Sequence, residues 1–69
     1  MNNDVKALRK ARSLRQEDLA AECGVTRQTI IAVENDRYDP SLHLAMRIAQ
    51  VLGAPVEDIF HLGDGDAAE

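Results

Sequence analysis

Aromatic residues and cysteine are scarce in this sequence of 69 residues. It contains no Trp, one Tyr, one Phe and one Cys. The core must therefore be built from aliphatic side chains, and a chain of this length buries only about 60% of the surface that its unfolded form exposes. We expect a single domain of marginal stability, for which self-association is a natural supplement.

The single cysteine, Cys23, excludes an internal disulfide framework. With only His43 and His61 beside it, the sequence offers too few ligands for a structural zinc site, and it predicts no cofactor. The N-terminus lacks the basic start and apolar run of a secretory signal, and no apolar run approaches the ~20 residues of a membrane span. These absences predict a soluble, cytoplasmic protein that binds neither metal nor membrane.

The net charge of −4 argues at first against a nucleic acid partner, but the acidic residues are unevenly distributed. Residues 1–40 contain seven basic and seven acidic residues, whereas residues 41–69 contain one basic and five acidic residues. Distant charges are screened beyond a Debye length of ~8 Å. The neutral N-terminal part can therefore still meet phosphate if its basic residues gather on one face.

Apolar spacing and turn residues predict five short helices, and no stretch alternates with the period of a strand. The expected helices are a first one that Asn3 or Asp4 caps and that ends near Arg12, then 16–23 (ended by Gly24), 26–35 (capped by Thr26), 42–52 (capped by Ser41, ended by Gly53) and a short one from Pro55. The fold class is therefore all-α. Residues 1–62 form the expected domain, and residues 63–69 an acidic, disordered tail.

The third expected helix has two distinct faces. Projection at 100° per residue places Ile30 and Val33 on one side and Arg27 and Gln28 on the other. In a major groove, Arg can form paired hydrogen bonds with guanine and Gln with adenine, each discriminating by ~1–3 kcal/mol. An ordinary solvated helix face is the alternative, because both residue types are common on exposed helices.

The chain resembles a known family along residues 4–60. The matching stretches are Leu8-Arg9, Leu14 to Ala20 (LRQEDLA), Gly24 to Ile30 (GVTRQTI), Val33 to Asp36 (VEND), Pro40-Ser41-Leu42 and Ala49 to Phe60 (AQVLGAPVEDIF). In these stretches it resembles the Cro/phage-repressor type, or XRE-like, helix-turn-helix transcriptional regulators, particularly their short stand-alone members. This resemblance implies a five-helix, lambda-repressor-like DNA-binding domain and double-stranded DNA as the partner.

The resemblance also implies roles for individual residues. Arg27 and Gln28 would read bases, and Ala32 stands where relatives often have a polar reader. Ile31 is a candidate on its own position, because an apolar residue on this outward face can pack on thymine methyl groups. The residues implied to contact phosphate are Gln16, Thr29 and Arg37, with Arg12 and Arg15 as additional candidates for which solvated charge is the alternative.

Structural roles follow from the same resemblance. It implies a partly buried ion pair between Arg9 and Glu34. Two residues depart from the family pattern: Ser13 stands where Gly or another turn former is common, and Arg15 stands where Ser or Thr usually caps the second helix. Loss of such a cap costs ~1 kcal/mol, so both departures are expected to weaken the domain.

We expect a homodimer that acts as a repressor and places two recognition helices in successive major grooves, ~34 Å apart, on an inverted repeat. The candidates for the dimer face are Val56, Ile59, Phe60 and Leu62, although the first three could equally belong to the core. The alternatives are an antitoxin-type regulator and a protein-interaction module that has kept the fold. The sequence shows no catalytic constellation and no segment for a small-molecule effector, so an enzyme is the least favoured class.

Overall fold

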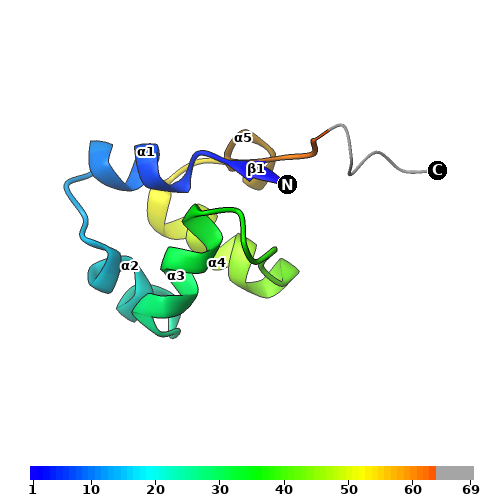
Figure 1. The fold of residues 1–69 in the computed structure, drawn as a ribbon. Helices are drawn as coiled ribbons and strands as arrows, with labels where there is room; N and C mark the ends of the chain where they lie inside the picture. The colour runs from blue at the N-terminus through cyan, green and yellow to red at the C-terminus, as the bar shows by residue number, and fades with distance from the viewer. Residues whose placement is uncertain (64–69) are drawn as a thin grey trace.

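The structure, a computed structural model, describes residues 1–63 of the chain. Five helices surround one core (Figure 1): α1 (Val5–Ala11), α2 (Gln16–Cys23), α3 (Arg27–Glu34), α4 (Leu42–Leu52) and α5 (Val56–Ile59). The predicted all-α class with five helices is confirmed. Apart from Gly63, the predicted acidic tail lies outside the described residues.

The helix ends follow the local signals in the sequence. The side chains of Thr26 and Ser41 cap α3 and α4, since their hydroxyl oxygens accept hydrogen bonds from the backbone N–H of Thr29 (3.3 Å) and Leu44 (3.1 Å). The stop residues Gly24 and Gly53 have φ angles of 71° and 70°, the left-handed conformation that glycine adopts without a steric penalty.

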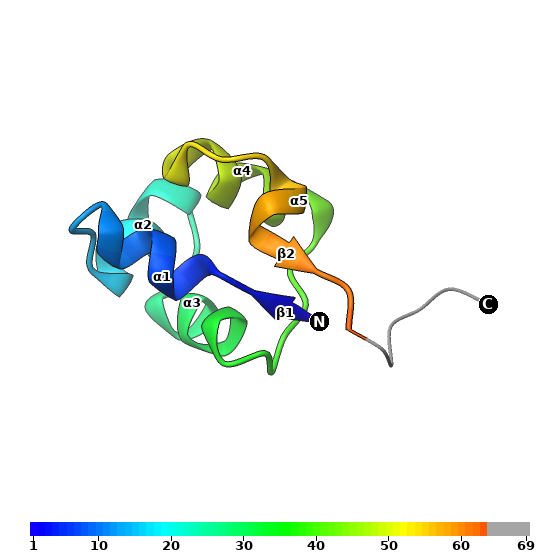
Figure 2. The same ribbon diagram turned by 90° about the horizontal axis from the view of Figure 1, so that it is seen from above.

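One pair of short strands was not predicted. A two-residue strand β1 (Asn2–Asn3) pairs antiparallel with β2 (Phe60–His61), and Figure 2 shows them side by side. The backbone N–H of Asp4 continues this contact by donating to the carbonyl of Ile59 at 2.8 Å. The pair thereby fastens the start of the chain to the end of α5, and it is too short to leave an alternating pattern in the sequence.

The core is aliphatic, as the composition requires. Its fully buried side chains come from all five helices: Val5, Leu19, Ile30, Val33, Ile48 and Ile59. Full burial of such a side chain contributes about 1.5–3 kcal/mol, so these residues dominate the stabilisation of the fold. None of the helices within residues 1–63 combines the length and the apolar character needed to cross a membrane.

The structure corrects the proposed dimer face. Ile59 is 0% exposed and Phe60 only 8% exposed, so both side chains are already used by the core of one copy. This burial does not support the prediction that they lie on an interface, and it favours the alternative, left open by the sequence, that both belong to the core. Val56 is half-buried and Leu62 is 73% exposed, so these two remain available for contact.

Ser13 lies in the turn between α1 and α2 with a φ of 58°. Its backbone N–H donates to the carbonyl of Lys10, and the N–H of Leu14 donates to that of Arg9, which fixes Ser13 in this left-handed conformation. The left-handed region costs an L-residue ~1–2 kcal/mol, whereas glycine costs ~0.5–1 kcal/mol in chain entropy. The Ser in this position is therefore a source of strain.

We expect Ser13→Gly to raise the free energy of unfolding by up to about 1 kcal/mol. The steric strain that the substitution removes costs more free energy than the additional chain entropy that glycine loses on folding. Urea denaturation, monitored by circular dichroism, measures this change in the free energy of unfolding. Ser13→Ala is the matched control, because it also removes the hydroxyl group but keeps the strained Cβ. Equal stability of the Gly and Ala variants would contradict the explanation by backbone strain.

Candidate nucleic-acid interface

Helices α2 and α3 form a helix-turn-helix unit. The turn of residues 24–26 joins them, and the N–H of Val25 donates to the carbonyl of Ala20 at 3.0 Å, which closes the end of α2. A Cβ on Gly24 would meet no atom within 4 Å, so glycine is required here for its positive φ and not for space. Buried Leu19 and Ile30 belong to the one core cluster and hold the two helices together.

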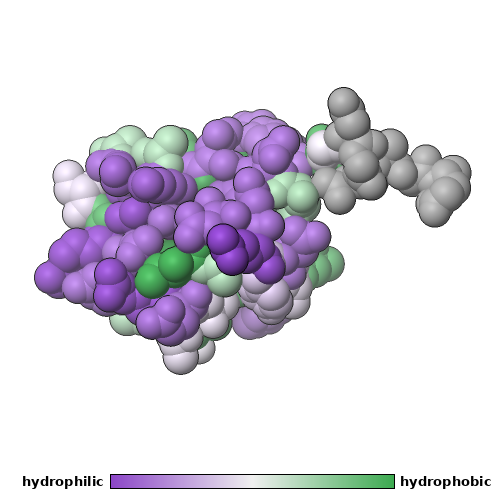
Figure 3. All heavy atoms as spheres, viewed as in Figure 1, coloured by the Kyte–Doolittle hydropathy of each residue, from purple (hydrophilic) through white to green (hydrophobic). Residues whose placement is uncertain are grey.

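The solvent face of α3 presents the two predicted base readers. Arg27 and Gln28 are both exposed on the first turn of the helix, while Ile30 and Val33 are fully buried on its opposite face. Ile31 and Ala32 are half-buried. Figure 3 shows a small hydrophobic patch over α3, surrounded by hydrophilic side chains. The helix thus combines paired hydrogen-bond donors and acceptors with a small apolar surface.

A buried ion pair connects α3 to α1. The Nε of Arg9 donates to Oε2 of Glu34 at 2.7 Å, and Nη2 donates to Oε1 at 3.3 Å. A further bond runs from Nη1 of Arg9 to the carbonyl of Leu14 at 2.8 Å. The two side chains are only 8% and 3% exposed. This pair joins α1 to the last residue of α3 and satisfies both charges with hydrogen bonds.

Gln16 connects this ion pair to the recognition helix. Its Nε2 donates to Oε1 of Glu34 at 3.1 Å, and its Oε1 accepts a hydrogen bond from Nε of Arg27 at 3.3 Å. Both ends of the amide are therefore used inside the protein. The guanidinium of Arg27 keeps its Nη groups for other partners, because a guanidinium has five N–H donors. The orientation of Arg27 is thus linked to the buried carboxylate of Glu34.

The other predicted phosphate contacts lie at opposite ends of α3. The Oγ1 atoms of Thr29 and Thr26 are 3.1 Å apart at the N-terminal end. Arg37 is exposed just beyond the C-terminal end, where its backbone N–H donates to the carbonyl of Ala32 at 2.9 Å. The half-buried Thr29 and the exposed Arg37 lie at places suited to contact the two phosphate strands that border a groove.

Arg12 lies elsewhere. Its Nε donates to the carbonyl of Leu52 at 2.8 Å, and a Cβ on Gly53 would collide with its guanidinium. Arg12 therefore caps the C-terminal end of α4, where a cation is favoured by the helix dipole. Figure 2 shows that this end of α4 lies across the domain from α3. This placement does not support the predicted phosphate contact of Arg12.

Arg15 is the N-cap residue of α2, and its side chain is 72% exposed. The expected weakening of this cap is offset by Asp18, whose Oδ2 accepts a hydrogen bond from the backbone N–H of Arg15 at 2.9 Å. The Nε of Arg15 also donates to this oxygen at 3.1 Å. These hydrogen bonds from Arg15 lower the pKa of Asp18. The carboxylate of Asp18 thus satisfies the backbone N–H of the N-cap residue, but within residues 1–63 no side chain accepts from the first N–H groups of α2 as a Ser or Thr at position 15 would.

Sequence reasoning missed the role of Asn3. Its Oδ1 accepts a hydrogen bond from the N–H of Val5, the first residue of α1, at 3.0 Å, whereas the N-cap residue Asp4 makes no side-chain cap bond. Its Nδ2 also donates to the carbonyl of Val33 at 2.8 Å and to Oδ1 of Asp36 at 2.9 Å. Asn3 therefore fixes the C-terminal end of α3 and the turn that leads to Arg37. These partners are 30 or more residues away, so no local signal reveals them.

The comparisons with known proteins agree with this geometry. Residues 5–59 match the family model for helix-turn-helix proteins. The chain belongs to this family of DNA-binding transcriptional regulators. An uncharacterized helix-turn-helix regulator of Methanocaldococcus jannaschii is 52% identical over 66 residues, which cover 96% of this chain and 100% of that protein. The XRE-like resemblance predicted from the sequence is confirmed.

Two further similarities extend to other members of the helix-turn-helix family. The immunity repressor of Bacillus phage phi105 is 40% identical over 55 residues, covering 80% of this chain and 38% of the repressor. The restriction-modification controller protein C.AhdI of Aeromonas hydrophila has a TM-score of 0.76 and 30% identity, covering 81% of this chain and 85% of that structure. The names of these relatives are those of regulators and not of enzymes. Among residues 1–63, no group of three or more His, Cys, Asp or Glu side chains is arranged to hold a metal.

Proposed function

We propose that this helix-turn-helix protein is a homodimeric repressor that reads an inverted repeat in double-stranded DNA. The observation that carries the proposal is the pair Arg27 and Gln28, exposed side by side on the first turn of α3. A recognition helix reads base edges with the residues of its N-terminal end. A repressor of this kind works where the chromosome is, which places it in the cytoplasm.

In the proposed complex, Arg27 pairs with a guanine and Gln28 with an adenine. Ile31 packs against thymine methyl groups, and Ala32 adds a methyl contact but no hydrogen bond. Gln16, Thr29 and Arg37 bind phosphates and set the register of the protein on the duplex. Arg15 adds charge near the start of α2. The arrangement of these side chains around one exposed helix supports this division of roles.

The proposal of a dimer rests on exposed apolar surface. Val56 and Met46 line a groove of about 460 Å³ between α4 and α5. Met46 is 51% exposed and Leu62 is 73% exposed. Solvation of these side chains is unfavourable in a single copy, and a two-fold contact would cover them. Val56 and Leu62 therefore keep their proposed place in the interface, and Met46 replaces the buried Ile59 and Phe60.

The repressor role is supported by the similarity to the phage immunity repressor. Two copies on an inverted repeat act as one bivalent ligand, because binding of the first recognition helix raises the effective concentration of the second. A dimer of small domains can therefore stay bound to an operator from which a single copy would dissociate quickly.

Selection of bound duplexes from a randomised DNA pool tests the proposal. We expect the wild type to enrich an inverted repeat whose half-sites are about 10 base pairs apart, and the double variant with Arg27→Ala and Gln28→Ala to lose this enrichment. Lys6→Ala is the control, since it removes an exposed cation on α1 that makes none of the interactions described above.

Each outcome of the selection decides a separate part of the proposal. Enrichment of one half-site would contradict the dimer but not the reading of bases by α3. Enrichment that persists in the double variant would contradict the roles of Arg27 and Gln28. No enrichment at either low or high salt would contradict sequence-specific binding and favour an interaction module.

A further inference from the structure

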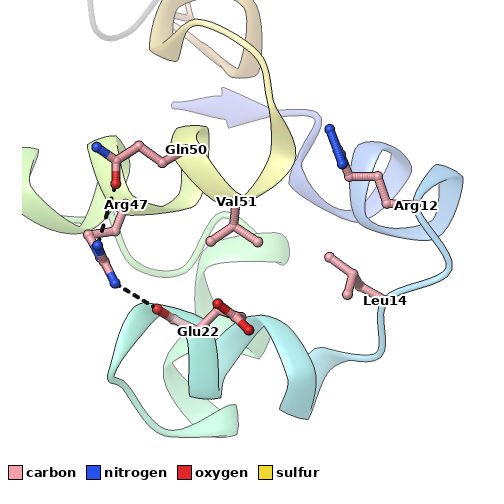
Figure 4. A pocket seen from close by; sticks show the side chains of 6 residues that line it. All are labelled: Arg12, Leu14, Glu22, Arg47, Gln50 and Val51. Carbon is pink, nitrogen blue, oxygen red and sulfur yellow. Dashed lines mark hydrogen bonds between the residues drawn. The ribbon is translucent and has the colours of Figure 1, made fainter.

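A second site lies on the flank of the domain, away from the exposed face of α3. It is a pocket of about 470 Å³ between the α1–α2 connection, α2 and α4 (Figure 4). Its lining consists of Arg12, Leu14, Glu22, Arg47, Gln50 and Val51. Pockets that bind small molecules have volumes of roughly 300–1,000 Å³, so this one has the size of a small-ligand site.

Two arginines in the lining of the pocket donate hydrogen bonds to backbone carbonyls near the C-terminal ends of helices. The Nε of Arg12 donates to the carbonyl of Leu52, and Nη2 of Arg47 donates to the carbonyl of Glu22 at 3.0 Å. Arg12 uses only this nitrogen: within residues 1–63, its Nη1 and Nη2 have no hydrogen-bond or ion-pair partner. This pair of nitrogens forms the planar edge that binds a carboxylate with two parallel hydrogen bonds. The hydrogen bond to the carbonyl of Leu52 fixes the guanidinium of Arg12 before a ligand binds, which reduces the side-chain entropy lost on binding.

The pocket also presents an opposite charge and an apolar surface. Within the described part of the chain, the carboxylate of Glu22 has neither an ion pair nor a hydrogen bond, because Arg47 binds the backbone oxygen of this residue and not its side chain. Leu14 and Val51 are half-buried, and Figure 4 shows them between the charged side chains. The lining thus offers one unpaired cationic edge, one unpaired carboxylate and two aliphatic side chains.

We propose that this pocket binds a small aliphatic amino acid in its zwitterionic form. Its carboxylate lies on the Nη edge of Arg12, its ammonium group on Glu22, and its aliphatic side chain on Leu14 and Val51. A dianion would be repelled by Glu22, and a simple amine would leave Arg12 without its counter-ion. No sequence signal indicates an effector, because these groups lie on separate segments that only the fold brings together. The inference does not depend on the proposed operator binding.

Titration of the isotope-labelled full chain with L-leucine, followed by two-dimensional NMR, tests this site. We expect saturable shifts of the backbone signals of Leu14, Glu22 and Val51, with a dissociation constant in the millimolar range. Three analogues separate the contacts: α-ketoisocaproate lacks the ammonium group, isopentylamine lacks the carboxylate, and glycine lacks the aliphatic side chain. Each is expected to bind about tenfold or more weakly than leucine.

Two variants identify the residues that bind the ligand. Glu22→Gln is expected to weaken leucine binding about tenfold and to abolish the preference for leucine over α-ketoisocaproate, with unchanged folding because the side chain is exposed. Arg12→Gln is expected to weaken leucine and the keto acid equally. Lys6→Gln is the control and leaves both affinities unchanged. Absence of saturable shifts with leucine, equal binding of all four probes, or no effect of Glu22→Gln would each overturn the proposal.

Discussion

Glu34→Ala is expected to lower the free energy of unfolding by about 3–5 kcal/mol, because it leaves the buried guanidinium of Arg9 without a counter-charge. The two side chains are 8% and 3% exposed, so water cannot replace the lost carboxylate. In a domain of this size, 1 kcal/mol corresponds to roughly 4–8 °C in the midpoint of thermal unfolding. The variant should therefore lose a large part of its stability, as measured by circular dichroism during heating and in urea.

The matched control is Glu17→Ala, which removes a carboxylate whose side chain is 53% exposed. Exposed ion pairs contribute about 0–1 kcal/mol, so this variant should unfold close to the wild type. A second variant separates pairing from packing: the double change of Arg9→Met and Glu34→Leu removes both charges and should recover much of the stability lost in Glu34→Ala. A thermal shift near zero for Glu34→Ala would contradict an energetic role for the buried pair.

Gln16→Ala is expected to reduce the preference for the base opposite Arg27 about tenfold, although Gln16 itself is not expected to touch that base. Gln16 accepts a hydrogen bond from Nε of Arg27 at 3.3 Å and is held by Glu34 at 3.1 Å. Without the amide, Arg27 must be ordered at the moment of binding, which costs side-chain entropy. The domain itself should remain folded, because the Arg9–Glu34 bonds persist.

A double-mutant cycle measures this coupling in operator binding. We expect the effects of Gln16→Ala and Arg27→Ala to be non-additive by about 0.5–3 kcal/mol, as is typical of residues in one hydrogen-bond network. The cycle of Gln16→Ala with Gln28→Ala is the control, because within residues 1–63 no hydrogen bond joins the side chains of Gln16 and Gln28. Loss of a phosphate contact alone would weaken binding to all sequences equally. Additivity in both cycles would therefore contradict the positioning of Arg27 by Gln16 and leave the proposed phosphate contact as the role of Gln16 in binding.

Much of the secondary structure could be predicted because its signals are local. Thr26 and Ser41 cap helices through hydrogen bonds to residues three positions ahead, and Gly24 and Gly53 end helices through their own φ angles. The two faces of α3 follow from the 3.6-residue period, which places Arg27 and Gln28 outside and Ile30 and Val33 inside. The pairing of Arg9 with Glu34 was available only from the family resemblance, since no period relates residues 25 positions apart.

The helices, the caps of α3 and α4 and the side of α3 that faces water follow from the sequence alone, because each depends on neighbouring residues. The packing of the helices was needed to show that Arg12 binds the end of α4 and that Ile59 and Phe60 belong to the core. It also decided that Arg12 and Glu22 share a pocket. The physical reason is that helical periodicity shows which side chains share a face, whereas the packing of the helices determines which faces meet and which polar groups become partners.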